Sequence, residues 1–195
     1  MRTTKLTRNT NETQIDISIN LDGTGIYDVK TPIGFLTHML ESFAKHGLFD
    51  LELNSMGDLE VDQHHLVEDV GIALGEAFDQ VLGDKKGINR NGFCIYPMDD
   101  SLVTVALDLG GRPYFSFLGE FRRRYCGELD LDLLEDFFRG FSSALKINLF
   151  IEINQGTNDH HKVEAIFKAL AKSLMQACSI NSRIKNIIPS TKGVI

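Results

Sequence analysis

A His-His-x-x-Glu pattern occurs twice in this chain, and together the two copies contain four of its six histidines. The copies are His64, His65 and Glu68, followed by His160, His161 and Glu164. Imidazole and carboxylate groups are common ligands of first-row divalent metal ions. A single pair of adjacent histidines often only caps or solvates the start of a helix. The same pattern doubled on similar flanking segments instead indicates a protein that binds metal ions, and more than one.

Helical geometry decides how each pattern divides its ligands. On a helix, residues i and i+4 lie on one face, whereas residues i and i+1 diverge by about 100°. His64 can therefore share an ion with Glu68, while His65 points towards a different one. The second copy behaves in the same way. Two copies then predict two equivalent sites, each with two histidines and one carboxylate.

The segments that precede the metal patterns are also repeated. Residues 13–23 and 101–111 alternate apolar and polar positions and end in glycine, as half-buried strands do. Residues 36–47 and 134–145 have the apolar spacing of amphipathic helices. Strand-like runs and then the metal-pattern helices follow in each half. The second half is longer before its first helix, around residues 117–129.

This order predicts an α+β fold made of a duplicated half-domain. Each half contains strands, a helix, a strand and a helix, so both helices cover one face of a sheet and the two sheets pack helix layer to helix layer. We place the first repeat at residues 1–90 and the second at 91–195, together forming one catalytic unit.

The alignment of the repeats supplies a fourth ligand for each site, since His38 on the earlier helix of the first half corresponds to Asp136 in the second. The expected sites are His64, Glu68, His161 and Asp136 in one, and His65, His38, His160 and Glu164 in the other. Imidazole and carboxylate ligands without thiolate suit Mn, Fe, Co or Zn, and open octahedral positions favour Mn or Fe.

Other candidate residues are weaker when taken singly. Glu12 precedes a strand, where it is either a general acid or base or only a solvated carboxylate. His46 before glycine is an ordinary helix C-terminal signal. Cationic and hydroxyl side chains in loops suit phosphate binding, although surface solvation is the default for each; these are Arg90, Arg112, Ser190 and Lys192. For the basic run 122–124 we expect a solvated or inter-subunit role.

The bulk composition narrows the class of protein. The 195 residues are 43% hydrophobic with a net charge of −7, which allows a real core and disfavours non-specific binding to nucleic acid. The three cysteines match no zinc or redox motif and are expected to be reduced in a cytoplasmic protein. No run approaches the ~18 apolar residues of a membrane span, and the polar N-terminus lacks the apolar core of a signal peptide.

These motifs resemble those of one enzyme family, the imidazoleglycerol-phosphate dehydratases of histidine biosynthesis. The resemblance rests on RNTNET, LTHMLESFAKHG, DQHHLVEDVGIALG, GGRP, EDFFRGF, NDHHKVEAIFKALA and PSTKG, which occur in this order along nearly the whole chain. One departure concerns Asp136, which stands where many members have histidine.

The resemblance implies a reaction, cofactors and an assembly. The reaction converts D-erythro-imidazoleglycerol phosphate to imidazole-acetol phosphate and water. Two Mn ions are expected per active site, with Fe, Co or Zn as substitutes. The implied fold has two four-stranded sheets and resembles the second domain of ribosomal protein S5. Trimers are expected to form a 24-subunit particle with interfacial active sites, without nucleic-acid or membrane partners.

The resemblance also assigns roles to single residues. Positions that match metal ligands are His38, His64, His65, Glu68, His160, His161 and Glu164. Those that match phosphate or substrate binders are Arg90, Arg112, Ser190 and Lys192, while Glu12 matches the acid or base and His46 lines the site. Since the hydrogen lost from C2 is not beside a carbonyl, the imidazole must accept the electrons, and an imidazolate bound by two metal ions fits that need.

Two other classes of protein remain as alternatives. A non-catalytic metal store in a helical bundle uses Glu-x-x-His patterns, the reverse of the order found here, and has no alternating strands. A dinuclear metallohydrolase commonly draws on bridging carboxylates, whereas these patterns are richer in histidine. Strand content would argue against the first class, and release of phosphate from a generic ester would favour the second.

Overall fold

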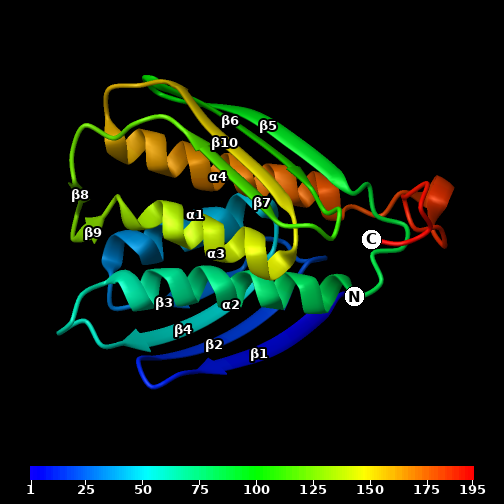
Figure 1. Cartoon of the computed structure of the whole chain (residues 1–195), viewed down its shortest axis with the longest axis horizontal. Coiled ribbons are helices and arrows are strands. Elements are labelled where there is room, and N and C mark those ends of the chain that lie inside the picture. The colour runs from blue at the N-terminus through cyan, green and yellow to red at the C-terminus, as the bar shows by residue number, and fades with distance from the viewer.

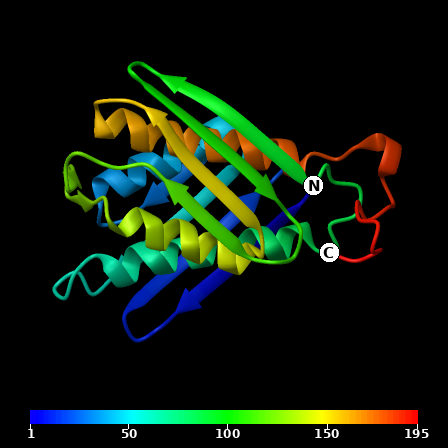
Figure 2. The same cartoon turned by 45° about the horizontal axis from the view of Figure 1, so that its top comes forward.

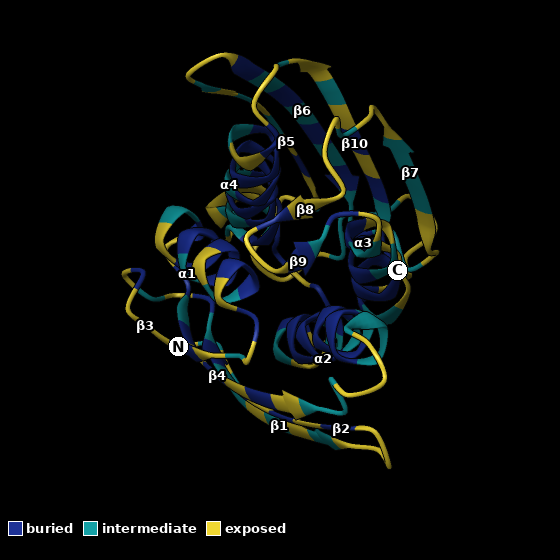
Figure 3. Cartoon of the chain, turned by 90° about the vertical axis from the view of Figure 1, so that its left-hand side faces the viewer, coloured by how far each residue is buried: buried dark blue, intermediate teal, exposed yellow.

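The computed structural model describes residues 1–195 and places four long helices between two four-stranded sheets (Figure 1). Viewed from one end, the buried faces of both sheets and of all four helices point to the same interior (Figure 3). This is the predicted α+β architecture. No helix in it is both long and apolar enough to span a bilayer.

The first sheet has the order β1-β2-β4-β3. Its strands are β1 (Thr3–Asn9), β2 (Thr13–Asn20), β3 (Tyr27–Lys30) and β4 (Asp50–Gly57). β3 runs parallel to β4, and the other pairings are antiparallel. In β2, Ile15, Ile17 and Ile19 alternate with polar residues, so one face enters the core and the other meets solvent.

The second sheet repeats this topology in the order β5-β6-β10-β7 (Figure 2). Its strands are β5 (Asn91–Met98), β6 (Ser101–Asp108), β7 (Tyr114–Leu118) and β10 (Asn148–Gln155). Here too the one parallel pair, β7 with β10, comes at the same place in the order. The division into repeats at residue 90 remains our proposal, and β5 begins at the next residue.

The helices pair across the two halves. They are α1 (Gly34–Gly47), α2 (His64–Leu82), α3 (Leu133–Leu145) and α4 (Asp159–Cys178). α1 packs beside α4, and α2 packs beside α3 (Figure 3). Glycines bring α2 and α3 close: a Cβ at Gly75 would lie 2.6 Å from the carbonyl oxygen of Phe141. A helix of the first half therefore contacts a helix of the second half in both pairs.

The additional residues of the second half lie across the N-terminal ends of the helices (Figure 3). They contain a short hairpin, β8 (Tyr125–Cys126) and β9 (Leu129–Asp130). The Gln63 side chain bonds to the backbone of Glu128 and Asp130, at 2.7 and 3.1 Å. The hairpin is thereby attached to the start of α2. A 3-10 turn, Ser182–Ile184, precedes the C-terminal tail.

Candidate metal centre

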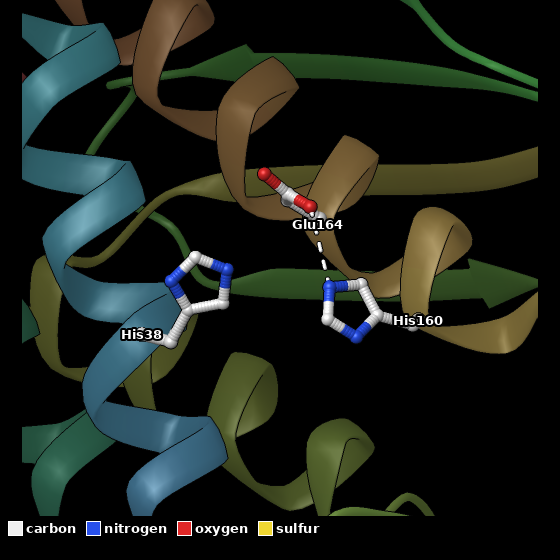
Figure 4. Close-up of side chains that lie close together, drawn as sticks. All are labelled: His38, His160 and Glu164. Atoms are coloured by element: carbon white, nitrogen blue, oxygen red, sulfur yellow. Dashed lines mark ion pairs between the residues drawn. The ribbon is translucent and has the colours of Figure 1, made fainter.

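One cluster of predicted ligands forms where α1 meets α4. The ligand atoms of His38, His160 and Glu164 all lie within 4.8 Å of one another, and Nε2 of His160 is 3.4 Å from Oε2 of Glu164. Figure 4 shows both α4 side chains directed towards His38 on α1. Glu164 follows His160 by one helical turn, as the sequence predicted.

The electrostatics of this cluster favour an anionic carboxylate. Burial by itself raises the pKa of Glu164. A 2.8 Å hydrogen bond from Lys168 Nζ, with the charges of Lys168, His38 and His160, outweighs burial and holds this pKa below its usual value. Bonds of about 2 Å from a metal to nitrogen and oxygen require ligand atoms a few ångströms apart. Two imidazoles and one carboxylate at these separations fit a divalent cation.

A second cluster forms where α2 meets α3. Nε2 of His64 is 3.7 Å from Oε2 of Glu68, and Nδ1 of the same ring is 3.7 Å from Oδ2 of Asp136. The two carboxylates thus approach different ring nitrogens. An ion on Nε2 would be shared with Glu68, while Asp136 would orient the ring from its other side, an arrangement common around metal-bound histidines.

The two remaining histidines of the patterns point away from these clusters. Nδ1 of His65 is 3.1 Å from Asp58 Oδ2 and 3.7 Å from Glu12 Oε2. The hydrogen bond to Asp58 raises the pKa of His65, against the opposing effect of burial. His161 instead contacts Asp100 at 2.8 Å and Asp99 at 3.5 Å. Within one chain, neither His65 nor His161 reaches the cluster expected for it.

Sequence reasoning missed Asp58 and Asp100. A signal was present, because Asp58 closely follows a strand-like run and Asp100 directly precedes the predicted strand 101–111. The hydrogen bond from His161, followed by bonds from Thr157 and Asn158, holds the pKa of Asp100 far below its usual range. Each carboxylate contacts Nδ1 of its histidine, and would orient a ring that bound an ion through its other nitrogen.

The four predicted phosphate binders meet in one pocket of about 340 Å³, whose lining includes Arg90, Arg112, Ser190 and Lys192. Arg90 is already engaged there, since Nε and Nη2 contact Asp108 at 2.7 and 2.9 Å and Nη1 donates to the Pro189 carbonyl. Arg112 and Lys192 are exposed cations without an ion pair. These two carry the free positive charge of the pocket.

Glu12 and His46 occupy separate places. Glu12 lies on the turn between β1 and β2, whereas His46 lies at the end of α1 with its ring 6.0 Å from that of Tyr96. Burial, reinforced by the charges of Lys168 and Lys172, lowers the pKa of His46. The basic run 122–124 has exposed side chains, while two of its backbone N–H groups donate to Asp159.

The N-terminal ends of α2 and α4 and the C-terminal tail of the chain lie at opposite ends of the molecule (Figure 1). His160 is in the first turn of α4, and the pocket is lined by the C-terminal tail that follows this helix. A helix of 20 residues is ~30 Å long. One small phosphorylated molecule cannot contact both regions of the same chain.

Comparison with known proteins assigns the chain to a family. The sequence model described as Imidazoleglycerol-phosphate dehydratase matches residues 31–174. The dehydratase of Koribacter versatilis is 48% identical over 195 residues, which cover all of both chains. A histidine biosynthesis bifunctional protein of Legionella pneumophila is 51% identical over 194 residues, covering all of this chain and 54% of that protein.

Solved structures agree with this assignment. The dehydratase of Staphylococcus aureus superposes with a TM-score of 0.83 at 35% identity, over 92% of this chain and 99% of that one. The enzyme of Pyrococcus furiosus, in complex with (S)-C348, gives 0.84 at 35% identity, over 97% and 100%. The chain therefore belongs to the imidazoleglycerol-phosphate dehydratase family, whose members dehydrate imidazoleglycerol phosphate in histidine biosynthesis.

Proposed function

We propose that this dehydratase works at sites shared between subunits, where two Mn ions hold the imidazole ring and a neighbouring subunit holds the phosphate. The observation that carries the proposal is the ~30 Å separation, within one chain, between the metal clusters and the phosphate pocket. If a second subunit places its pocket beside these clusters, one substrate molecule can contact both a metal cluster and a phosphate pocket. The same arrangement allows His65 and His161 of neighbouring copies to supply the ligands that the two clusters lack within one chain.

The outer faces of the sheets support self-association. On the second sheet, Phe93 and Phe150 are 67% and 48% exposed and align in one row across the strands, with Ile95, Tyr114 and Leu118 around them. The outer face of the first sheet carries charged and polar side chains instead. A contiguous apolar patch commonly marks an interface. The proposed assembly is the trimer-based 24-mer, with the apolar face covered by further copies of this chain.

In the proposed mechanism the chain binds, orients and moves protons. Arg112, Lys192 and Ser190 hold the phosphate, which fixes the orientation of the glycerol carbons. When bound, the ions supply Lewis acidity that stabilises negative charge on the imidazole ring, so the ring can expel the C3 hydroxyl. Glu12 then accepts the C2 proton, and the substrate becomes an enol. This proton and the expelled hydroxide together make up the water that is released, and the enol tautomerises to the ketone.

Complementation between two inactive variants tests the shared site. His160→Ala disables a metal cluster, and Lys192→Ala disables a phosphate pocket, so each variant alone should turn over slowly. If every site combines these residues from different subunits, mixed assemblies reformed after metal removal should contain intact sites, about one in four at equal mixing. Absence of recovery in verified mixed particles would contradict the proposal.

Removal of metal tests the same idea at the level of assembly. Ligands from several subunits meet at each proposed site, so chelation should shift the particle to smaller oligomers and halt ketone formation. Added Mn should restore both. A large particle that persists through size-exclusion chromatography after verified metal loss would rule out assembly by metal, and a metal-free enzyme that still forms ketone would rule out the metal-dependent chemistry.

A further inference from the structure

The turn that carries Glu12 is closed by its own side chains. Thr10 Oγ1 accepts hydrogen bonds from the backbone N–H groups of Glu12 and Thr13, at 3.1 and 2.9 Å. The backbone N–H of Asp58 donates to the Glu12 carbonyl at 3.1 Å. The Glu12 side chain is 52% exposed and its carboxylate accepts no hydrogen bond, although it lies 3.7 Å from His65 Nδ1. The backbone is therefore held while the carboxylate stays free.

A buried acid on the metal-binding helix anchors this turn. Asp69 follows Glu68 on α2, and its side chain is only 11% exposed. Its Oδ2 accepts a 2.5 Å hydrogen bond from Thr13 Oγ1, and its Oδ1 accepts a 2.7 Å bond from Arg8 Nη2. Thr13 is itself 2% exposed and also contacts Thr10 Oγ1 at 3.1 Å. A continuous path thus joins α2 to the backbone of Glu12.

The second half shows that the fold does not need this acid. The residue that corresponds to Asp69 in α4 is Ala165, and it is fully buried. There the turn between β5 and β6 is attached to the start of α4 through its own carboxylate, Asp100. That carboxylate accepts bonds from His161 Nδ1 at 2.8 Å and from the backbone of Thr157 and Asn158, at 2.6 and 3.0 Å. The Asp100 carboxylate is therefore occupied by the hydrogen bonds that hold its turn.

We propose that Asp69 is a positioning residue for Glu12 and acts through the Thr13 hydroxyl. Asp69 holds the turn between β1 and β2, so the Glu12 carboxylate is not needed to hold it. The carboxylate therefore remains available for proton transfer, next to the helix that carries His65. The inference rests on the proposed acid or base role of Glu12. A general base must stand within hydrogen-bond reach of the proton it takes, and a displacement of ~1 Å can cost roughly 100-fold in rate.

Thr13→Val tests the hydroxyl alone, since valine has nearly the same shape as threonine. We expect kcat to fall by roughly 10- to 100-fold with little change in KM and with Mn content and particle size retained. Thr13→Ser restores the hydroxyl and should recover most of the kcat. Thr7→Val is a matched control: it removes a Thr–Asp hydrogen bond of the same 2.5 Å length, which joins β1 to β2 on their outer face, and it should leave kcat unchanged.

A double-mutant cycle separates this inference from the role of Glu12 itself. In a Glu12→Gln background, Thr13→Val should cause no further loss of the residual turnover. An equal loss in both backgrounds would overturn the positioning role, and so would a Thr13→Val enzyme of normal kcat beside an inactive Glu12→Gln enzyme. Normal kcat in Glu12→Gln would instead refute the acid or base role on which the inference depends.

Asp69→Asn provides a second route if Thr13→Val does not fold. Asparagine keeps an oxygen for Thr13 but loses the charge that faces Arg8. Its kcat loss should again disappear in the Glu12→Gln background. A loss that persists there would show that Asp69 acts on the metal helix rather than on the turn, and the inference would be wrong.

Discussion

The turns between β1 and β2 and between β5 and β6 occupy matching places, yet their carboxylates are used differently. Asp100 is surrounded by His161, Thr157 and Asn158, whereas Glu12 stands free near His65. The neighbouring helices also differ, with Asp69 in α2 and Ala165 at the matching position in α4. A duplicated fold can keep the same framework in both halves while only one half retains a reactive side chain.

Loss of the Glu12 carboxylate should have the largest effect on catalysis. Glu12→Gln keeps the size of the side chain but removes proton transfer, so kcat should fall by roughly 10²- to 10⁴-fold while metal content stays intact. Asp100→Asn should act differently, because it weakens the attachment of His161 and of the turn, and so should lower metal affinity. Steady-state kinetics with metal analysis distinguish the two. A near-normal kcat for Glu12→Gln would show that another group moves the proton.

The two metal clusters should respond to separate substitutions. His38→Ala should empty the cluster with His160 and Glu164, while Asp136→Ala should weaken only the cluster of His64, by roughly 10- to 100-fold in metal affinity. Asp136→His should be tolerated if Asp136 only orients the His64 ring, since a neutral imidazole can also accept a hydrogen bond from Nδ1. Anomalous diffraction at the Mn edge separates the sites. If Asp136→Ala leaves both sites full and active, Asp136 is only a surface carboxylate.

The cationic side chains of the proposed phosphate pocket are of two kinds: Arg112 and Lys192 are free, and Arg90 is paired. Arg112→Ala and Lys192→Ala should each weaken substrate binding by roughly 1.5–3 kcal/mol through loss of a charge-assisted phosphate contact. Arg90→Ala should chiefly lower stability, because Arg90 already binds Asp108 and the Pro189 carbonyl. Binding measurements with phosphorylated and unphosphorylated imidazole ligands test this. Equal loss for both ligand types would refute phosphate binding.

The smallest effect per site concerns the outer faces of the two sheets. Phe150→Asp should weaken self-association, since burial of its exposed half contributes about 1 kcal/mol at each interface. Lys5→Glu, on the polar outer face of the first sheet, should leave the particle intact. Light scattering coupled to size-exclusion chromatography follows both. A Phe150→Asp particle of unchanged size over a dilution series would mean that this face is not an interface.

Much of the fold was predictable because periodicity is a local property. Alternation at residues 13–23 and 101–111 indicated strands, the doubled pattern placed the metal helices, and β2, β6, α2 and α4 confirm these elements. The helix-to-helix packing of two sheets also followed from the order of elements. The hairpin of the long insertion was not predicted, because two-residue strands carry no periodicity.

Helical spacing alone was enough to predict which side chains share a face: His64 with Glu68, and His160 with Glu164. The sequence also indicated that four loop residues suit phosphate, and the structure gathers these in one pocket. The repeat alignment also predicted that His38 and Asp136 belong to different clusters, whereas the helix pairing that brings this about, α1 beside α4 and α2 beside α3, is visible only in the folded chain. The tertiary structure alone revealed that Asp69 holds the Glu12 turn and that the pocket lies at the far end. Such contacts join residues distant in the sequence, so the packing of the whole core sets them, whereas helical spacing depends only on the local chain.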